Sequence, residues 1–321
     1  MKKLKKIGIV LIVIFSILGL FWGVVNIIPS KKVIKDNPFM KTDQTLISAH
    51  RGGALMNPEN TEMAFDYVIL ETNYTDIVEI DVRTTKDGKL VIIHDETINR
   101  TALDEDKEDV YISDKTVLEL KQYNLGYNFI DRNNDRLYDD YNLIEATLAG
   151  LTIMTLEEFL IKYYESRNIL LYLEIKEKGE AAINAADIAL DLLEQYDWWK
   201  DRTMIISFDD PVIDYISKTD HLQLVGALGY KIAPVLILNV FALDTLFTPN
   251  YHSLQTKMSN TVGITLDCAT KRLVDECHEK NMAVTYWTIN EEEDMKKLIE
   301  IGADVITTNA PDVLAKLLGK I

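Results

Sequence analysis

The sequence contains few cysteines, and their placement excludes several kinds of site. Only Cys268 and Cys277 occur among 321 residues, and no CxxC or Cys/His zinc spacing is present. If residues 269–280 form the helix that their pattern indicates, nine residues of helical rise separate the two thiols by about 13 Å. That distance is too long for a disulfide, so we expect two buried, unpaired thiols.

Positive charge is scarce as well. The chain has 34 Lys and Arg against 51 Asp and Glu, which gives a net charge of −17. This balance excludes nucleic acid as a partner and argues against broad docking on anionic lipid, because both need clustered basic residues. A small anionic substrate is still compatible, since one arginine, one lysine and a metal ion can make a pocket locally positive. The sequence also lacks a glycine-rich phosphate loop and low-complexity stretches, and its 47% hydrophobic content allows a full globular core.

One long uncharged apolar run stands at the amino terminus. Residues 7–28 follow four lysines and are long enough to span a bilayer of about 30 Å. No A-x-A cleavage site or nearby cysteine follows, so we expect an uncleaved signal anchor, with residues 1–6 cytoplasmic and 29–44 a polar tether. The positive-inside rule then predicts a single-pass protein of the cell membrane with residues 45–321 outside the cell. A secreted protein cut near residue 30 is the alternative.

From residue 45 to residue 321, strand-like and helical patterns alternate. Strand-like runs occur at 45–49, 76–82, 90–94, 169–175, 203–208, 222–227, 262–266, 283–288 and 304–308. Helical patterns occur at 61–72, 155–166, 180–196, 210–218, 270–280, 291–301 and 311–319, with Asn60 or Thr61, Thr155 and Asn290 as expected N-caps. Strands and helices joined by short links predict a parallel sheet, and eight repeats would close a TIM-type (β/α)8 barrel. Nine strand candidates leave one in excess, and residues 96–153 form an acidic insertion after the third strand.

Polar and aromatic residues fall where barrel enzymes carry their chemistry, at the carboxyl ends of the expected strands. They are His50, Asp81, Glu174, Phe208, Trp287 and Thr308. An open doubly wound sheet would also bind ligands at strand carboxyl ends, but it would need the glycine-rich loop that is missing here.

Residues 48–95 hold the densest group of reactive side chains. Glu79 and Asp81 lie two apart in a strand, so they point to the same face. The pair Asp87-Gly88 is a strong two-residue hairpin signal, and a turn there places His94 opposite Asp81. Carboxylate oxygens prefer calcium or magnesium, and a histidine suits general acid or base work. The sequence therefore predicts a divalent cation beside a proton-transfer group.

Several ordered motifs resemble the glycerophosphodiester phosphodiesterase family. They are HRG at 50–52, PENT at 58–61, EIDVRTTKDGKLVIIHD at 79–95, LEIK at 173–176, SF at 207–208, WTIN at 287–290 and GADVITTNAP at 302–311. The resemblance runs from about residue 46 to 316, and the ordered set is far more specific than HRG alone. One departure is Asn309, which stands where the family usually has Asp; we expect it to affect the local geometry of the barrel end rather than the chemistry.

The resemblance implies a metal site formed by Glu79, Asp81 and Glu174. All-oxygen ligation of this kind suits one Mg²⁺ or Ca²⁺ ion better than zinc. Lys176 lies two residues beyond Glu174 on the same strand face. Together with Arg51 and the cation, it is expected to stabilise the charge that builds on the phosphate.

The expected proton-transfer pair is His50 and His94, and either residue can be the acid or the base. Glu59 is expected to orient Arg51 or its loop. Trp287 is a candidate wall for the glycerol side of the substrate, with a core position as the alternative. The remaining histidines are expected to be surface or packing residues: His221, His252 and His278.

The expected activity is metal-dependent hydrolysis of glycerophosphodiesters, including phospholipid head-group esters, to an alcohol and glycerol 3-phosphate. A substrate hydroxyl next to the phosphate or a water molecule can be the attacking group. Lysophospholipids and teichoic-acid-like polymers are alternative substrates for the same barrel. An inositol-lipid phospholipase C is disfavoured by the EID and LEIK carboxylates. A phosphate-ligand-binding barrel is the non-enzyme alternative, but such a protein would more naturally have lost His94 or a metal ligand.

Overall fold

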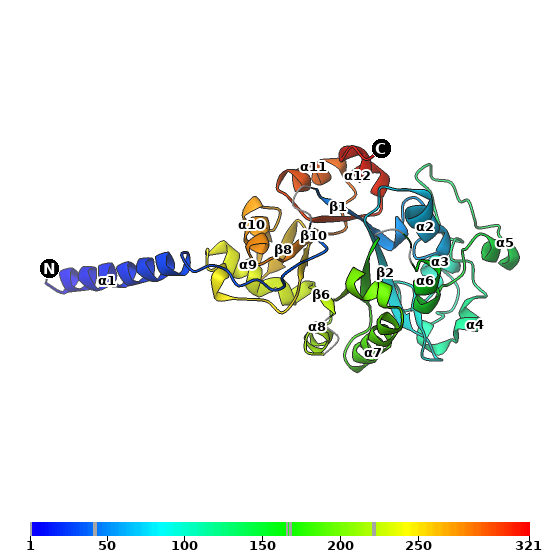
Figure 1. The fold of residues 1–321 in the computed structure, drawn as a ribbon, viewed down its shortest axis with the longest axis horizontal. Helices are drawn as coiled ribbons and strands as arrows, with labels where there is room; N and C mark the ends of the chain where they lie inside the picture. Colours follow the sequence, from blue (N-terminus) through cyan, green and yellow to red (C-terminus); the bar gives the residue numbers. More distant parts are fainter. Residues whose placement is uncertain (1, 41–43, 165, 167–168, 220–222) are drawn as a thin grey trace.

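A computed structural model of the chain describes residues 2–40, 44–164, 166, 169–219 and 223–321 (Figure 1). His221, residues 41–43 of the expected tether, residue 165 of an expected helix and residue 222 of an expected strand lie outside the described residues.

Eight parallel strands in the described part of the chain close into a barrel. They are β1 (Leu46–Ala49), β2 (Ile77–Thr84), β4 (Leu170–Ile175), β5 (Thr203–Ser207), β6 (Leu224–Ala227), β7 (Ser253–Thr256), β10 (Ala283–Tyr286) and β11 (Val305–Thr308). The barrel closes because β1 pairs with β2 on one side and with β11 on the other. These strands are buried on both faces, which is why several of them read as nearly continuous apolar runs. The predicted TIM-type architecture is confirmed.

Helices cover the outside of the barrel. The α-helices are α2 (Glu62–Asp66), α6 (Leu156–Lys162), α7 (Glu180–Gln195), α8 (Asp210–Ile216), α9 (Ala233–Val240), α10 (Lys271–Glu279), α11 (Glu292–Glu300) and α12 (Pro311–Leu317). Shorter turns are the 3-10 helices η1 (His50–Gly52), η4 (Asp197–Arg202), η5 (Gly229–Ile232) and η6 (Asp244–Leu246) and the π-helix η2 (Tyr67–Glu71). The sequence pattern did not predict α9.

Two of the three expected helix caps are confirmed. Thr61 accepts a hydrogen bond from the Ala64 backbone, and Thr155 forms a capping box at the start of α6. The expected cap at Asn290 is wrong. Its side-chain oxygen accepts from the Asn309 backbone instead, because two loops meet at this end of the barrel.

Two of the nine predicted strands lie outside the closed barrel, and one barrel strand was not predicted. The expected strand at 262–266 belongs to a separate antiparallel pair, β8 (Ser259–Val262) and β9 (Ile264–Asp267), and the side chains of β9 are mostly exposed. The expected strand at 90–94 is β3 (Leu90–Ile92), which pairs antiparallel with β2 outside the closed barrel. The barrel strand that was missed is β7, whose short sequence SLQT has three polar residues out of four and resembles a loop.

The hairpin of β2 and β3 has a different register from the predicted one. Val82 pairs with Ile92, and the backbone of Asp81 accepts from Ile93 rather than lying opposite His94. The reason is a longer turn: the Thr85 backbone donates to Lys89, so three residues stand between them instead of two. Gly88 adopts φ 71° in this turn, which glycine tolerates best. His94 therefore lies beyond the end of β3 and is not paired with Asp81.

The insertion after β3 is confirmed, and it carries a small core of its own. It contains α3 (Asn99–Ala102), η3 (Ile112–Asp114), α4 (Val117–Leu120) and α5 (Leu143–Leu148). Its apolar cluster comprises Val91, Ile93, Ile98, Ala102, Ile112, Leu120, Leu125 and Ile153. Figure 1 shows the insertion on the side of the barrel away from α1.

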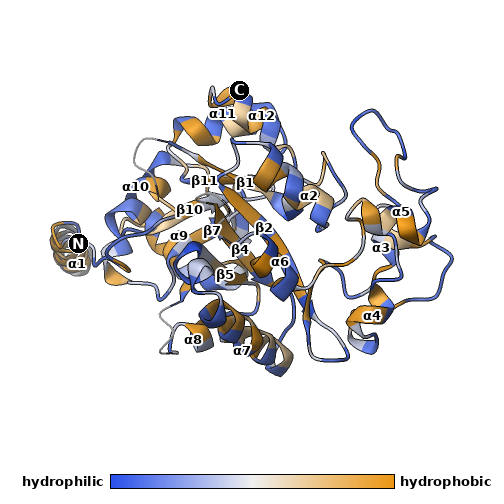
Figure 2. Cartoon of the chain, turned by 45° about the vertical axis from the view of Figure 1, so that its right-hand side comes forward, coloured by the Kyte–Doolittle hydropathy of each residue, from blue (hydrophilic) through white to orange (hydrophobic). Residues whose placement is uncertain are grey.

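The first helix, α1 (Lys2–Val25), extends away from the barrel (Figure 1), and Figure 2 colours much of it as hydrophobic. Its described side chains from Ile9 to Phe21 are exposed. Its last turn is fixed beside α9, since Trp22 Nε1 donates to the Phe241 carbonyl at 3.1 Å. In the part of the chain that the structure describes, no helix combines the length and the apolar character that a membrane crossing needs.

The described part of segment 29–44 lies against the amino-terminal end of the barrel. Phe39 is fully buried there and stacks on Tyr172 of β4 with ring centroids 4.9 Å apart. Asn37 donates to the His252 carbonyl at 2.8 Å. These contacts close the bottom of the barrel, so the reactive groups described below stand at its opposite end.

Candidate active site

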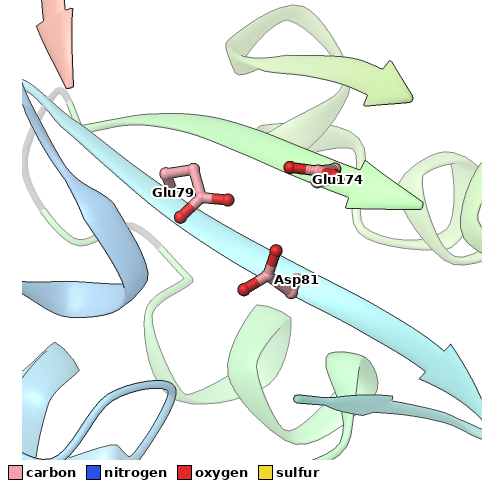
Figure 3. A group of neighbouring side chains, drawn as sticks. All are labelled: Glu79, Asp81 and Glu174. Atoms are coloured by element: carbon pink, nitrogen blue, oxygen red, sulfur yellow. The ribbon is translucent and has the colours of Figure 1, made fainter. Parts of the chain in front are cut away.

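Three buried carboxylates converge at the carboxyl-terminal rim of the barrel (Figure 3). Glu79 and Asp81 come from β2 and point to the same side, and Glu174 comes from the neighbouring strand β4, where it pairs in register with Asp81. Each residue offers one oxygen such that these oxygens lie within 4.8 Å of one another. Their exposed fractions are 3%, 1% and 8%. This is the set that the sequence analysis named as metal ligands.

The electrostatics of these carboxylates fit a bound divalent cation. Burial, together with the negative charges of Asp81 and Glu174, raises the pKa of Glu79 well above its usual range. Burial also raises the pKa of Glu174, although Lys176 opposes the shift. Asp81 Oδ1 is buried and accepts no hydrogen bond from a described residue. A cation of the Mg²⁺ or Ca²⁺ type would coordinate these oxygen atoms and offset the negative charge of three neighbouring carboxylates.

Two basic residues stand beside the carboxylates. Arg51 Nε lies 3.2 Å from Asp81 Oδ2, and Lys176 Nζ lies 2.6 Å from Glu174 and 3.4 Å from Asp81. These two charges lower the pKa of Asp81 even though burial alone would raise it. Asp81 Oδ2 also accepts a hydrogen bond from Asn60 Nδ2 at 2.9 Å. The centre therefore combines anionic ligand atoms with cations able to face a phosphate.

The HRG turn after β1 has a backbone shape that presents its side chains to this centre. Arg51 adopts φ 53°, and its backbone N–H donates to Glu79 at 2.8 Å. Gly52 adopts φ 80°, and a Cβ atom built there would lie 2.8 Å from the Cβ of Ala64. Only glycine satisfies both conditions, so α2 can pack tightly beneath the turn.

His50 is held by an amide. Its Nδ1 lies 2.6 Å from Asn309 Oδ1, and an amide oxygen can only accept, so the proton sits on Nδ1 and leaves Nε2 free. Burial, and then the charge of Arg51, lower the pKa of His50 to about 4. We expected Asn309 to influence only the barrel end, but the structure places it directly on a predicted catalytic residue.

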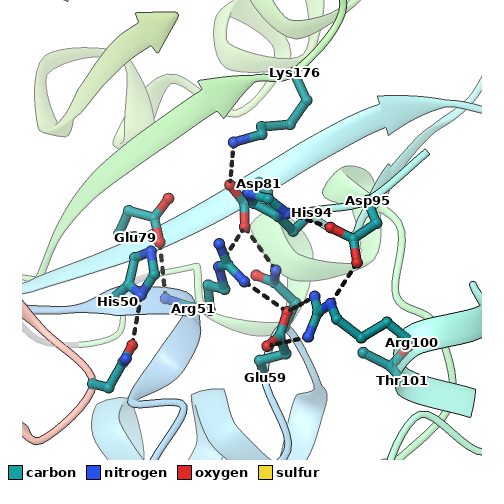
Figure 4. Close-up of polar contacts among 12 residues, drawn as sticks. His50, Arg51, Glu59, Glu79, Asp81, His94, Asp95, Arg100, Thr101 and Lys176 are labelled. Atoms are coloured by element: carbon teal, nitrogen blue, oxygen red, sulfur yellow. Dashed lines mark hydrogen bonds and ion pairs between the residues drawn. The ribbon is translucent and has the colours of Figure 1, made fainter. Parts of the chain in front are cut away.

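His94 is held by a carboxylate. Its Nδ1 lies 2.5 Å from Asp95 Oδ1. The second oxygen of Asp95 accepts from Arg100 Nε at 2.5 Å, and Arg100 also binds Glu59, which in turn holds Arg51 at 3.0 Å (Figure 4). Burial alone would raise the pKa of Asp95, but the hydrogen bonds from His94 and Arg100 hold it well below its usual range. Asp95 therefore stays ionised.

The structure brings together eight of the nine predicted site residues: His50, Arg51, Glu59, Glu79, Asp81, His94, Glu174 and Lys176. Sequence reasoning did not place Asn60, Asp95 and Arg100 in the site, and considered Asn60 only as a helix N-cap. The signal for Asp95 and Asn60 was present, because both lie inside the HD and PENT motifs. Arg100 had no such signal, since it lies in the insertion.

Trp287 stands further along the rim. Its ring meets Phe208 edge-on with centroids 5.5 Å apart, and Lys257 Nζ lies 5.3 Å from the Trp287 ring centre. Trp287 packs against the core cluster inside the barrel and also lines a cavity of about 490 Å³ with Lys257, Met258, Ser259, Thr288 and Ile289. Both interpretations of this tryptophan, as wall and as core residue, therefore describe part of its environment.

Two other histidines lie away from this rim and have structural partners. His252 accepts from the Val225 backbone at 3.0 Å, and His278 lies 2.9 Å from Asp304, which precedes β11. Asp304 also accepts from the Val284 backbone. These contacts match the packing roles expected for both residues. Cys268 and Cys277 are buried free thiols, as expected.

Known proteins of one family resemble this chain in sequence and in fold. The sequence profile of the Glycerophosphoryl diester phosphodiesterase family matches residues 50–313. A glycerophosphodiester phosphodiesterase of Caldanaerobacter subterraneus is 30% identical over 278 residues, which cover 86% of this chain and 99% of that protein.

Two solved structures show the same fold. The glycerophosphoryl diester phosphodiesterase domain of a Mycobacterium tuberculosis protein has a TM-score of 0.70 at 18% identity, covering 87% of this chain and 100% of that one. An Oleispira antarctica phosphodiesterase in complex with the product sn-glycerol-3-phosphate has a TM-score of 0.62 at 21% identity, covering 88% and 98%.

Proposed function

The chain belongs to the glycerophosphoryl diester phosphodiesterase family and is an enzyme of that type, and we propose that it hydrolyses glycerophosphodiesters to an alcohol and glycerol 3-phosphate by metal-dependent catalysis with two histidines. The observation that carries the proposal is the cluster of three buried carboxylates with His50 and His94 beside it and Arg51 and Lys176 at its edge. The product bound to the Oleispira antarctica protein supports the same substrate class.

Glu79, Asp81 and Glu174 would hold one Mg²⁺ or Ca²⁺ ion, as their oxygen-only chemistry indicates. When bound, such an ion polarises a phosphoryl oxygen and offsets the charge that develops on it. Arg51 and Lys176 add positive charge on either side of Asp81, where an anionic phosphodiester would otherwise be repelled by the carboxylates.

The role that we assign to each histidine in proton transfer follows from the side chain that its Nδ1 atom contacts. Asn309 keeps the proton of His50 on Nδ1, so Nε2 is an available base that takes the proton of the attacking hydroxyl. The ionised Asp95 beside His94 stabilises a protonated ring, and that ring donates its proton to the departing alcohol oxygen. A hydroxyl of the substrate and a water molecule are both able to serve as the attacking group.

Purified full-length protein tests this proposal with three substrates: glycerophosphocholine, glycerophosphoglycerol and a lysophospholipid. We expect release of glycerol 3-phosphate from at least one of the first two, activity that disappears with chelator, and recovery with Mg²⁺ or Ca²⁺. Turnover of the lysophospholipid alone would identify a lysophospholipase D-type activity, and polymeric glycerophosphate as an added substrate would identify a teichoic-acid type. Full activity after exhaustive removal of metal would contradict the assigned metal site.

We also propose that the apolar run at residues 7–28 attaches the enzyme to the cell membrane with the barrel outside; this rests on the sequence and on exposed side chains, since no helix of the described residues meets the requirements for a membrane crossing. Exposed apolar side chains along α1 support this location, because a surface of that size rarely faces water in a monomeric protein. Protease added to intact cells should release a fragment that begins after α1, at about residues 26–45. Protection until lysis would reverse the orientation, and a natural amino terminus near residue 30 in the medium would identify a secreted form.

A further inference from the structure

Arg100 is the one side chain of α3 that reaches into the charge network of the active site. It lies on the first helix of the insertion, and its guanidinium is about half exposed. Its Nε donates to Asp95 at 2.5 Å, its Nη1 to Glu59 Oε2 at 2.9 Å and its Nη2 to Glu59 Oε1 at 2.7 Å (Figure 4). Arg100 therefore binds two separate carboxylates with three different nitrogen atoms.

Each of these carboxylates holds a group with a proposed catalytic role. The other oxygen of Asp95 is bound to His94 Nδ1 at 2.5 Å, and Glu59 Oε1 accepts from Arg51 at 3.0 Å. Arg100 thus connects the proton-transfer side of the site to the phosphate-binding side. It lies within hydrogen-bond distance of none of the metal-ligand carboxylates in the described structure, so its influence must pass through Asp95 and Glu59.

We infer that Arg100 is a positioning residue of the phosphodiesterase, through which the insertion fixes the orientation of His94. The inference rests on the proposed function of that histidine. A planar guanidinium presents several donors in a fixed geometry, so it can hold both carboxylates in set directions. Without it, Asp95 keeps one of its two side-chain partners and can turn about its own bond, and the His94 ring turns with it.

The competing explanation is an ordinary ion pair that fastens the insertion to the barrel. A second arginine of the insertion provides a matched control for that explanation. Arg132 binds Asp312 of α12 through two hydrogen bonds of 2.7 and 2.6 Å, and it too joins the insertion to the barrel. In the described structure, Arg132 hydrogen-bonds to none of the predicted site residues.

The first arm of the experiment compares turnover of glycerophosphocholine or glycerophosphoglycerol by full-length wild type, Arg100→Ala, Arg100→Lys and Arg132→Ala with metal present. We expect Arg100→Ala to lower kcat by about 10- to 100-fold, the usual loss when a group that orients a catalytic residue is removed. KM should change far less, because Arg51 keeps its contacts with Asp81 and Glu79. Arg132→Ala should stay near wild type, and Arg100→Lys should be intermediate because lysine lacks the fork geometry.

Added guanidinium at about 50 mM, far below denaturing concentration, should restore part of the kcat of Arg100→Ala and leave Arg132→Ala unchanged. A purely structural role would not respond in this way. Equal kcat values for Arg100→Ala and Arg132→Ala would overturn the inference, and so would a loss in Arg100→Ala that comes entirely from unfolding.

A second arm does not depend on turnover, which keeps this inference separate from the proposed function. Protein labelled with ¹⁵N at histidine reports the ring nitrogens of His94 by NMR, with His94→Gln used to assign its signals. Arg100→Ala should shift or broaden the His94 signals, while Arg132→Ala should leave them in place. Unchanged His94 signals in Arg100→Ala would refute the positioning role, even for a preparation that hydrolyses none of the three substrates.

Discussion

The two histidines at the rim differ in what holds them. His50 donates its Nδ1 proton to the neutral amide of Asn309, whereas His94 faces the ionised carboxylate of Asp95. The first partner is neutral, and the second carries a negative charge. Two residues of the same type at one site therefore have differently charged partners at a single ring nitrogen, and the proposed roles of base and acid rest on that difference.

The residues that hold the two rings also come from different parts of the fold. Asn309 lies on the loop after β11, which is part of the barrel itself, and it is tied to Asn290 through its backbone. Asp95 lies where the insertion begins and is held by Arg100 of that insertion. The partner of His50 thus belongs to the barrel, and the partner of His94 is held by a segment outside it.

Removal of the metal should have the largest effect, because both histidines act around the same carboxylate cluster. We expect chelation to remove detectable hydrolysis, and added Mg²⁺ or Ca²⁺ to restore it. The Glu174→Gln variant should need a higher ion concentration for half-maximal activity than the wild type. An unchanged ion requirement in that variant would separate Glu174 from the metal site.

Replacing each histidine by alanine should lower kcat by about two to four powers of ten for a natural glycerophosphodiester. Glycerophospho-p-nitrophenol separates the proposed roles of the two histidines, because p-nitrophenolate is a stable anion and leaves without a proton from a general acid. His94→Ala should recover most of its activity on this substrate, while His50→Ala should not. Recovery by His50→Ala alone would exchange the two roles.

The Asn309→Asp variant should give His50 a carboxylate partner, like the one that Asp95 provides for His94. Burial and Arg51 lower the pKa of His50 to about 4, so the wild-type base is free above that pH. A carboxylate at position 309 would favour the charged ring and raise this pKa by about one unit or more. The acid limb of the kcat/KM profile should therefore move to higher pH, and an unmoved limb would show that another group controls it.

The smallest effect is expected at His278, whose carboxylate partner Asp304 lies at the opposite end of the barrel. A hydrogen bond to Asp304 raises the pKa of His278 above its ordinary value of 6.5. The pair therefore stabilises the fold fully below about pH 6.5, and this contribution is lost as the pH rises through the folded-state pKa.

His278→Gln should consequently lower the unfolding temperature more at pH 5.5 than at pH 8.5, with kcat within about twofold of wild type because a distant site acts independently. A large loss of kcat would show that this carboxylate–histidine pair also matters for catalysis. Equal destabilisation at both pH values would exclude titration of His278 as the cause.

The sequence by itself determined the barrel and most of its reactive rim. Alternating strand and helix patterns predicted the parallel architecture, and the period of two predicted that Glu79 shares a face with Asp81 and Glu174 with Lys176. These features follow from local chain geometry, which acts between residues close in sequence. The family resemblance, not the period, implied that the three carboxylates form one site. Local pattern fails at β7, where a short and mainly polar strand is stabilised by burial between its neighbours β6 and β10.

The tertiary structure alone decided which partner each histidine meets. The contact of His50 with Asn309 joins residues 259 positions apart, and that of Arg100 with Glu59 joins residues 41 positions apart. Closure of the barrel brings β11 beside β1, and the packing of the insertion brings α3 to the rim. Hydrogen bonds between side chains depend on distances of a few tenths of an ångström, which no periodic pattern encodes. The different partners of His50 and His94, on which the proposed acid and base roles rest, are therefore a property of the folded chain.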